Sequence, residues 1–230
     1  MEILQPDASW FEIDPEFYRH GSSCLNPAES EGVDVRAGQS ILVAPPGSGE
    51  EALSFTNLGA EVTVLGNGEM LDRVRTLAGG AGMQLALMAG DAGDPSATFA
   101  PESFDAVYCP WGTLDGLDTF DRWAAGVAGV LKPAGRLVLY DRHPISSVGA
   151  AYKGLFVVGK SYFGDDEPAR TGWTLGDLIS SLGAEGLATM LFDEFPDADR
   201  FSTPLDKLGI RWDIRWRLPA AMLLVAIRVG

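Results

Sequence analysis

The chain has 230 residues and a net charge of −15, from 32 acidic against 17 basic residues. This length suffices for one sizeable hydrophobic core, and an acidic surface argues against nucleic acids and anionic membranes as partners. Two widely separated cysteines, Cys24 and Cys109, together with the lack of an export-signal pattern and of an apolar run of about 18 residues, lead us to expect a cytoplasmic location.

The first 36 residues predict an irregular N-terminal arm. Aromatic side chains, including Trp10 and Tyr18, are spread among proline, aspartate and serine without helical or strand periodicity. We expect this arm to pack over the rest of the protein.

Short apolar runs then alternate with helical patterns. The predicted strands are 40–44, 61–65, 83–88, 104–109 and 136–141, the predicted helices are 49–58, 69–78 and 119–131, and turns are expected at 79–82 and 132–135. Strands separated by helices imply right-handed crossovers, so the sequence predicts an α/β fold with a mostly parallel sheet covered on both faces.

The last third of the chain has a different pattern. Residues 142–172 are rich in aromatics and glycine, 173–185 predict a helix, and 187–195 and 221–229 predict strands of an antiparallel hairpin. We expect one domain in four parts: the arm (1–36), a cofactor-type core (37–143), an aromatic lid insertion (144–172), and the last helix and hairpin (173–230).

Several segments, in order, resemble the class I S-adenosylmethionine-dependent methyltransferases. They read "ILVAPPGSGEEALSFTNLGAEVTVLGNGEML", "LMAGDA", "FDAVYCPWGTL" and "DRWAAGVAGVLKPAGRLVLYDRHP". The resemblance implies a Rossmann-like fold with a seven-stranded, mostly parallel sheet, a C-terminal antiparallel hairpin, and ligands beyond the carboxyl ends of the strands.

The same segments depart from the family pattern at the cofactor motifs. Val43 stands where the family has an acid at the end of the first strand, and Pro45 replaces the first glycine of the following loop. Leu65 and Gly66 stand where a second acid binds the ribose hydroxyls. Each charge-assisted hydrogen bond contributes roughly 1.5–3 kcal/mol, so S-adenosylmethionine is expected to bind weakly or to have been lost.

Other cofactor positions are retained, according to the resemblance. Asp91 matches the acid that reads the adenine amino group, and Trp111 matches a residue that contacts adenine or the methionine portion. The implied cofactor-binding set is Gly47, Ser48, Gly49, Asp91, Ala92 and Trp111.

Three glutamates offer two interpretations. Glu50, Glu51 and Glu69 either return a carboxylate to the cofactor or complement helix N-terminal dipoles at the surface. The segment 47–52 also fits the dinucleotide pattern G-x-G-x-x-A, but two glutamates in the first turn of the helix would repel a pyrophosphate. The sequence therefore disfavours NAD or FAD.

The candidate catalytic residues follow the fifth strand or lie in the arm. His143, His20 and Asp141 are the candidates, since imidazole is a general base near neutral pH and a carboxylate can orient it. The alternatives are a histidine hydrogen-bonded to the backbone and a solvated loop carboxylate. No C-x-x-C or H-x-x-x-H pattern occurs, so no metal is expected.

The aromatic segment suggests an apolar substrate pocket under a lid, although plain packing of a long connection is an equal alternative. The candidate substrate-binding residues are Tyr18, Tyr152, Phe156, Tyr162 and Trp173. The sequence favours methyl transfer from S-adenosylmethionine to an apolar or aromatic metabolite. The alternatives are a methyltransferase-derived cyclase, isomerase or lyase that works without the cofactor, and a non-catalytic ligand-binding relative. The expected partner is a small molecule, and the sequence leaves the oligomeric state open.

Overall fold

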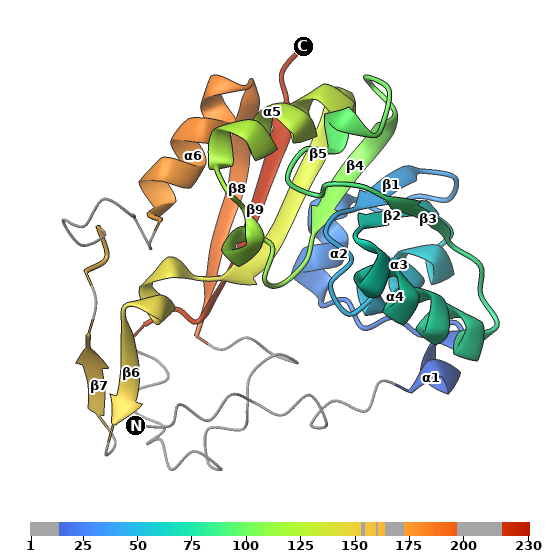
Figure 1. Ribbon diagram of the computed structural model, residues 1–230, viewed down its shortest axis with the longest axis horizontal. Helices are drawn as coiled ribbons and strands as arrows, with labels where there is room; N and C mark the ends of the chain where they lie inside the picture. Colours follow the sequence, from blue (N-terminus) through green and yellow to red (C-terminus); the bar gives the residue numbers. More distant parts are fainter. Residues whose placement is uncertain (1–13, 153–154, 160, 164–172, 197–217) are drawn as a thin grey trace.

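A mixed sheet of seven strands forms the centre of the protein (Figure 1). In this computed structural model, residues 14–152, 155–159, 161–163, 173–196 and 218–230 are described, without the side chains of 147, 149–152 and 155–158. The strand order is β3-β2-β1-β4-β5-β9-β8. Strands β1 to β5 run parallel to their neighbours, whereas β9 is antiparallel to both β5 and β8. The predicted α/β fold with an antiparallel C-terminal hairpin is confirmed.

The strands agree with the predicted runs in number and order. They are β1 (Ser40–Val43), β2 (Glu61–Gly66), β3 (Ala86–Ala89), β4 (Phe104–Cys109), β5 (Leu131–Arg142), β8 (Leu187–Phe195) and β9 (Ala221–Arg228). Alternate residues of β1 face opposite layers: Ile41 and Val43 pack on one face and Leu42 on the other. Such strands read as continuous apolar runs because both of their faces are buried.

Helices cover both faces of the sheet (Figure 1). The helices are α1 (Pro15–Arg19), α2 (Pro27–Val33), α3 (Glu50–Asn57), α4 (Gly68–Ala81), α5 (Phe120–Val130) and α6 (Leu175–Ala184). Trp123 of α5 and Leu178 of α6 pack on one face of the sheet, while Phe55 of α3 and Val74 of α4 pack on the other. Short 3-10 helices are η2 (Pro95–Ala97), η3 (Leu114–Gly116) and η4 (Pro144–Ser147).

Three expectations about elements were wrong. The arm is not irregular throughout, because α1 and α2 each begin with a capped proline that starts a helix, after Asp14 and Asn26. Residues 79–81 continue α4, which ends at the left-handed Gly82. Residues 132–135 lie within β5, where the pairing with β4 shifts register.

The segment after β5 contains a small separate hairpin. Strands β6 (Gly149–Tyr152) and β7 (Leu155–Val158) pair antiparallel to each other in a sheet of their own. The rest of the predicted lid falls largely on 164–172, outside the described residues. In the described part of the chain, no helix has the length and apolarity needed to cross a membrane.

Candidate functional site

A cavity of about 460 Å³ lies at the carboxyl ends of β1 to β4. The loops that follow these four strands supply its walls, so segments far apart in sequence meet there. Its lining residues are Pro45, Gly66, Asn67, Met70, Gly90, Asp91, Ala92, Gly93, Gly112, Thr113, Gly116 and Leu117. We call it the carboxyl-edge cavity. Its position and volume are typical of ligand sites in doubly wound sheets.

Asp91 is the ionisable side chain among the lining residues of this cavity. Its Oδ1 accepts a hydrogen bond from the Gly93 backbone at 2.8 Å, and its Oδ2 lies 2.8 Å from a guanidinium nitrogen of Arg122. The carboxylate is half exposed. It is therefore held in a fixed orientation and can still accept a hydrogen bond from a ligand.

The glycine loop after β1 packs closely against other segments of the chain. Gly47 and Gly49 have positive φ angles of 57° and 90°, which suit glycine. A Cβ at Gly47 would lie 2.9 Å from Cγ of Pro110, and one at Gly49 would lie 3.0 Å from Val74. Of the predicted set Gly47, Ser48 and Gly49, none lines the carboxyl-edge cavity.

The three glutamates near this loop have different surroundings. Glu50 accepts hydrogen bonds from the Tyr18 hydroxyl at 2.6 Å and from the Ser48 hydroxyl at 3.0 Å. Glu51 is buried, with Oε2 3.7 Å from the place that a Cβ at Gly47 would take. Glu69 is exposed and pairs with Arg73 at 2.6 Å. Only Glu51 remains near the loop as a buried carboxylate.

Asp141 organises the loop after β4. The buried carboxylate accepts hydrogen bonds from the backbone of Gly112 at 2.8 Å, Leu114 at 2.9 Å and Arg142 at 2.7 Å. Burial nevertheless raises the pKa of Asp141 to about 6, with a smaller contribution from the negative charge of Asp115. Since Gly112 lines the carboxyl-edge cavity, Asp141 holds one wall of the cavity in place without lining it.

His143 lies at the end of β5 with both ring nitrogens close to other groups of the chain. Its Nδ1 accepts a hydrogen bond from the Ile145 backbone at 3.1 Å, which caps η4. Its Nε2 lies 3.0 Å from a carboxylate oxygen of Glu194 on β8. Burial lowers the pKa of His143, although Glu194 opposes that shift. The neutral ring therefore carries its proton on Nε2, because Nδ1 acts as an acceptor.

His20 and Tyr18 lie on the arm, away from the end of β5. Arg19, between them, donates to the carbonyl of Gly80 near the C-terminal end of α4, which places α1 toward the amino ends of β2 and β3. His20 is exposed, 3.8 Å from Glu16. Tyr18 is buried with Leu53 and residues of α4, and burial raises its pKa. The structure therefore does not bring the two histidines together.

The predicted aromatic residues lie outside the cavity lining where they are described. Trp111 packs near Tyr140, with ring centroids 6.3 Å apart, and Arg142 lies over its ring. Trp173 packs edge-on against Phe120. The Tyr162 hydroxyl accepts a hydrogen bond from the Leu175 backbone at 3.1 Å. Tyr152 lies on β6 and Phe156 on β7, and their side chains are outside the described part of the chain.

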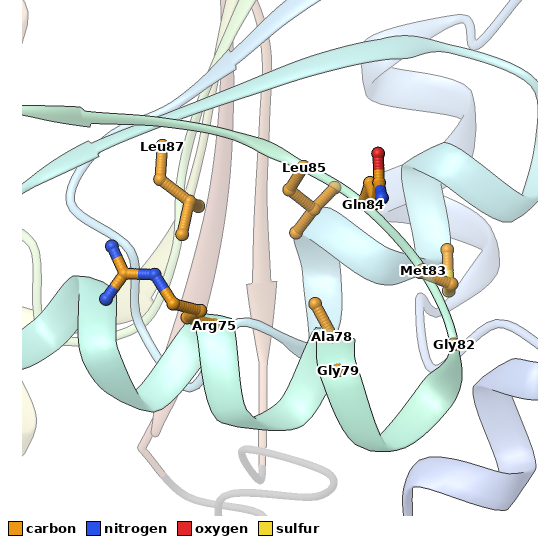
Figure 2. A pocket seen from close by; sticks show the side chains of 8 residues that line it. All are labelled: Arg75, Ala78, Gly79, Gly82, Met83, Gln84, Leu85 and Leu87. Carbon is orange, nitrogen blue, oxygen red and sulfur yellow. The ribbon is translucent and has the colours of Figure 1, made fainter.

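A larger hollow of about 630 Å³ lies between α4 and the segment that leads into β3 (Figure 2). Leu85 points toward the helix near Ala78, and Leu87 points toward it near Arg75. The C-terminal end of α4 and the beginning of β3 lie at the amino edge of the sheet. We therefore place the candidate site at the smaller carboxyl-edge cavity, where loops from four strands converge.

The cavity fits one end of S-adenosylmethionine better than the other. Asp91 can accept a hydrogen bond from the adenine amino group, and Met70 and Leu117 offer apolar surface to a flat ring. At the end of β1, however, Val43 is buried in the core, and β2 ends in Gly66, so no side chain there carries a ribose acceptor. The residues present do not fit the ribose and methionine portions.

Sequence reasoning missed most of the cavity wall. Of the predicted cofactor residues, Asp91 and Ala92 line the cavity, whereas Asn67, Thr113 and the glycines from 112 to 116 were not singled out. The position of these residues in the sequence could have indicated them. Polar residues and glycines follow the ends of β2, β3 and β4, and parallel strands bring the loops at these ends together.

A family model described as "Methyltransferase domain" matches residues 43–139. The sequence matches no curated protein at a significant level.

Three solved structures illustrate the likeness in fold. An S-adenosylmethionine-dependent methyltransferase from Mesorhizobium loti superposes with a TM-score of 0.67 at 20% identity, over 88% of this chain and 96% of that one. The [4+2]-cyclase SpnF gives 0.60 at 16% identity, over 88% and 79%. A geranyl diphosphate methyltransferase in complex with S-adenosylmethionine gives 0.60 at 11% identity, over 86% and 82%. These similarities show a shared fold.

Proposed function

We propose that this chain, a divergent member of the class I methyltransferase family by its fold and its residues 43–139, acts on an apolar or aromatic small molecule without using S-adenosylmethionine as a methyl donor. The molecule occupies the carboxyl-edge cavity. The observation that carries the proposal is the loop after β1, where Gly47 packs against Pro110 and where Gly47, Ser48 and Gly49 all stay outside the lining of the carboxyl-edge cavity. A cavity at the adenine end persists, with Asp91 in its wall.

Two of the three glutamates near the loop have other contacts. Glu50 binds the hydroxyls of Tyr18 and Ser48, and Glu69 pairs with Arg73 at the surface. The solved structures that share this fold include one with other chemistry, a [4+2]-cyclase. A cleft that selects its ligand by shape and by one carboxylate agrees with such a role.

A second function, methyl transfer with weakly held S-adenosylmethionine, is favoured by one specific observation. Glu51 is buried beside Gly47 in the loop after β1. If the loop admits the cofactor, this carboxylate is the group that would receive its ammonium. The two functions therefore differ in what Glu51 contributes to binding.

Calorimetric titration with S-adenosylhomocysteine and with adenosine separates the two functions. The proposal predicts dissociation constants within about tenfold of each other, because only the adenine end makes productive contacts. Binding of the ammonium and carboxylate by charge-assisted hydrogen bonds would add roughly 1.5–3 kcal/mol each, or about 10- to 100-fold per contact. S-adenosylhomocysteine that binds more than about 100-fold more tightly than adenosine would contradict the proposal.

Two variants serve as matched controls for this titration. Asp91→Asn is expected to weaken both ligands equally, since it alters the shared adenine end. Glu51→Gln is expected to leave both affinities unchanged under our proposal. Under methyl transfer, Glu51→Gln would weaken S-adenosylhomocysteine alone. Absence of any S-adenosylhomocysteine binding at millimolar concentration would exclude methyl transfer, and it would also contradict the retention of the adenine end of the site.

A further inference from the structure

Pro46 and Gly66 form an unusually close pair at the wall of the carboxyl-edge cavity. Gly66 is the last residue of β2 and lines the cavity, and Pro46 is a buried residue of the loop after β1. A Cβ built at Gly66 would lie 2.4 Å from Cγ and 2.6 Å from Cδ of Pro46. The proline ring therefore occupies the space in which any side chain at position 66 would begin.

Glycine is required at position 66 because there is no space for a side chain, and not because of its backbone conformation. Gly66 is absent from the residues with positive φ, unlike Gly47 and Gly49 in the neighbouring loop. Any L-residue could adopt its strand conformation, so the proline ring alone excludes a side chain. Pro46 cannot easily move away from such a side chain, because its ring is rigid and buried.

The neighbouring polar residues do not replace the missing side chain. The Asn67 side chain accepts a hydrogen bond from the Met70 backbone at 3.0 Å and caps α4. The Glu69 side chain is turned to solvent, where it pairs with Arg73. In doubly wound sheets that bind nucleotides, a carboxylate near the end of the second strand holds the ribose hydroxyls. Here that part of the wall is built from glycine and proline.

We propose that the Pro46–Gly66 pair determines the specificity of the cavity by excluding a side chain that would bind a ribose diol, so that the ligand is a flat ring molecule whose binding gains nothing from an attached sugar. The inference rests on the proposed function for the location of the ligand. Pro45, Met70 and Leu117 give the cavity apolar walls, and Asp91 accepts a hydrogen bond from an N–H or O–H group on the ring. An aromatic metabolite with such a donor has the matching chemistry.

The contact itself is tested by a double-mutant cycle that needs no ligand. Gly66→Ala is expected to lower the Tm by roughly 3–10 °C, because the new Cβ overlaps the proline ring. In the Pro46→Ala background the same substitution should cost much less, which gives a clear coupling between the two sites. Gly68→Ala is the matched control, since nothing lies within 4 Å of a Cβ at that position. An equal loss in both backgrounds would overturn the proposed contact.

The specificity is tested by titration with adenosine and 2′,3′-dideoxyadenosine, which differ in the ribose diol. The wild-type protein should bind the two within about threefold of each other, because the diol finds no acceptor at the end of β2. Pro46→Ala/Gly66→Asp, which opens the space and supplies a carboxylate, should prefer adenosine by about 10-fold or more. Pro46→Ala alone should gain no such preference.

The outcomes distinguish this inference from the proposed function. If the wild-type protein prefers adenosine by 10-fold or more, the cavity does bind the ribose diol, and the inference is overturned. The inference would also be overturned if Pro46→Ala/Gly66→Asp, shown by its Tm to be folded, had no preference between the two nucleosides. Tight binding of S-adenosylhomocysteine together with equal binding of the two nucleosides would contradict the proposed function and leave the role of the Pro46–Gly66 pair supported.

Discussion

Asp141 shows how one buried residue shapes the cavity without lining it. It was selected from the sequence as a catalytic candidate, and its catalytic role stays a prediction. In the structure its carboxylate accepts three backbone hydrogen bonds, two of them from the loop after β4. Truncation would leave these buried N–H groups without an acceptor, at a cost of roughly 1–3 kcal/mol for each group.

The raised pKa of Asp141 predicts a pH-dependent contribution to stability. Because its pKa in the folded protein is about 6, above the ordinary value, folding favours the protonated form. The free energy of unfolding of the wild type, relative to Asp141→Asn, should therefore rise by about 1 kcal/mol as the pH falls from roughly 7.5 to 5. Urea denaturation at the two pH values measures this difference. A relative loss of wild-type stability on acidification would show that the three N–H groups outweigh burial.

His143 gives a second prediction at the scale of a residue. Since its Nδ1 caps η4, His143→Ala should destabilise the protein by about 1 kcal/mol, whereas His143→Asn should retain most of the stability, because asparagine is a good N-cap. Thermal unfolding of the two variants checks this expectation. Equal losses in both variants would mean that the contact of Nε2 with Glu194, and not the cap, holds the loop.

Residue-level prediction from the sequence was limited by contacts through space. Asp91 could be selected because it follows a strand end in a familiar pattern, and the structure places it in the cavity wall. The packing of Gly47 against Pro110 could not be predicted, since the two residues belong to loops after different strands. The same holds for the partners of His143, which come from η4 and β8.

At the scale of elements, β5 carries the clearest departure from a regular strand. Its pairing with β4 shifts between Phe104 opposite Leu131 and Ala106 opposite Arg136, so four residues of β5 bulge out. The sequence "LKPAG" predicted a turn there because it contains residues typical of turns. The chain nevertheless remains within the strand. Such bulges bend a strand and increase its twist.

The bulge predicts a specific requirement for Gly135. A Cβ at this position would lie 2.7 Å from the carbonyl oxygen of Lys132, so Gly135→Ala should destabilise the protein by about 1–3 kcal/mol. Gly183→Ala, near the end of α6, is the matched control, because nothing lies within 4 Å of its Cβ. It should be neutral or stabilising by up to about 1 kcal/mol. Similar Tm values for the two variants would argue against the close contact.

Elements with strong periodicity were predicted well, and elements fixed by packing were not. The bounds of β4 agree with the predicted run, because a buried strand needs a continuous apolar sequence. The bounds of β8 agree as well, although this strand lies at the edge of the sheet and is largely exposed. Helix α1 spans only five residues and depends on its packing against α3 and α4. A single short turn of this kind has no sequence period to reveal it.

In the molecule as a whole, the sheet brings the loops after β1 to β4 together at the carboxyl edge. Residues of these loops then fill part of the space between them. The strand order follows from the alternation of strands and helices, so the fold was predictable from the sequence. The partial filling by Pro46 and Pro110 was not, because it depends on the distances between loops. A net charge of −15 also disfavours phosphate-bearing ligands in this cavity.

The central claim is that the adenine end of the site persists while the loop after β1 no longer takes part. Amide hydrogen exchange in the presence of millimolar S-adenosylhomocysteine tests it most directly. We expect slower exchange in segments 90–93 and 112–117, which contribute residues to the cavity lining, and unchanged exchange at 47–50. Comparable protection of 47–50 would contradict it, because the amino-acid portion of the ligand would then lie on the glycine loop.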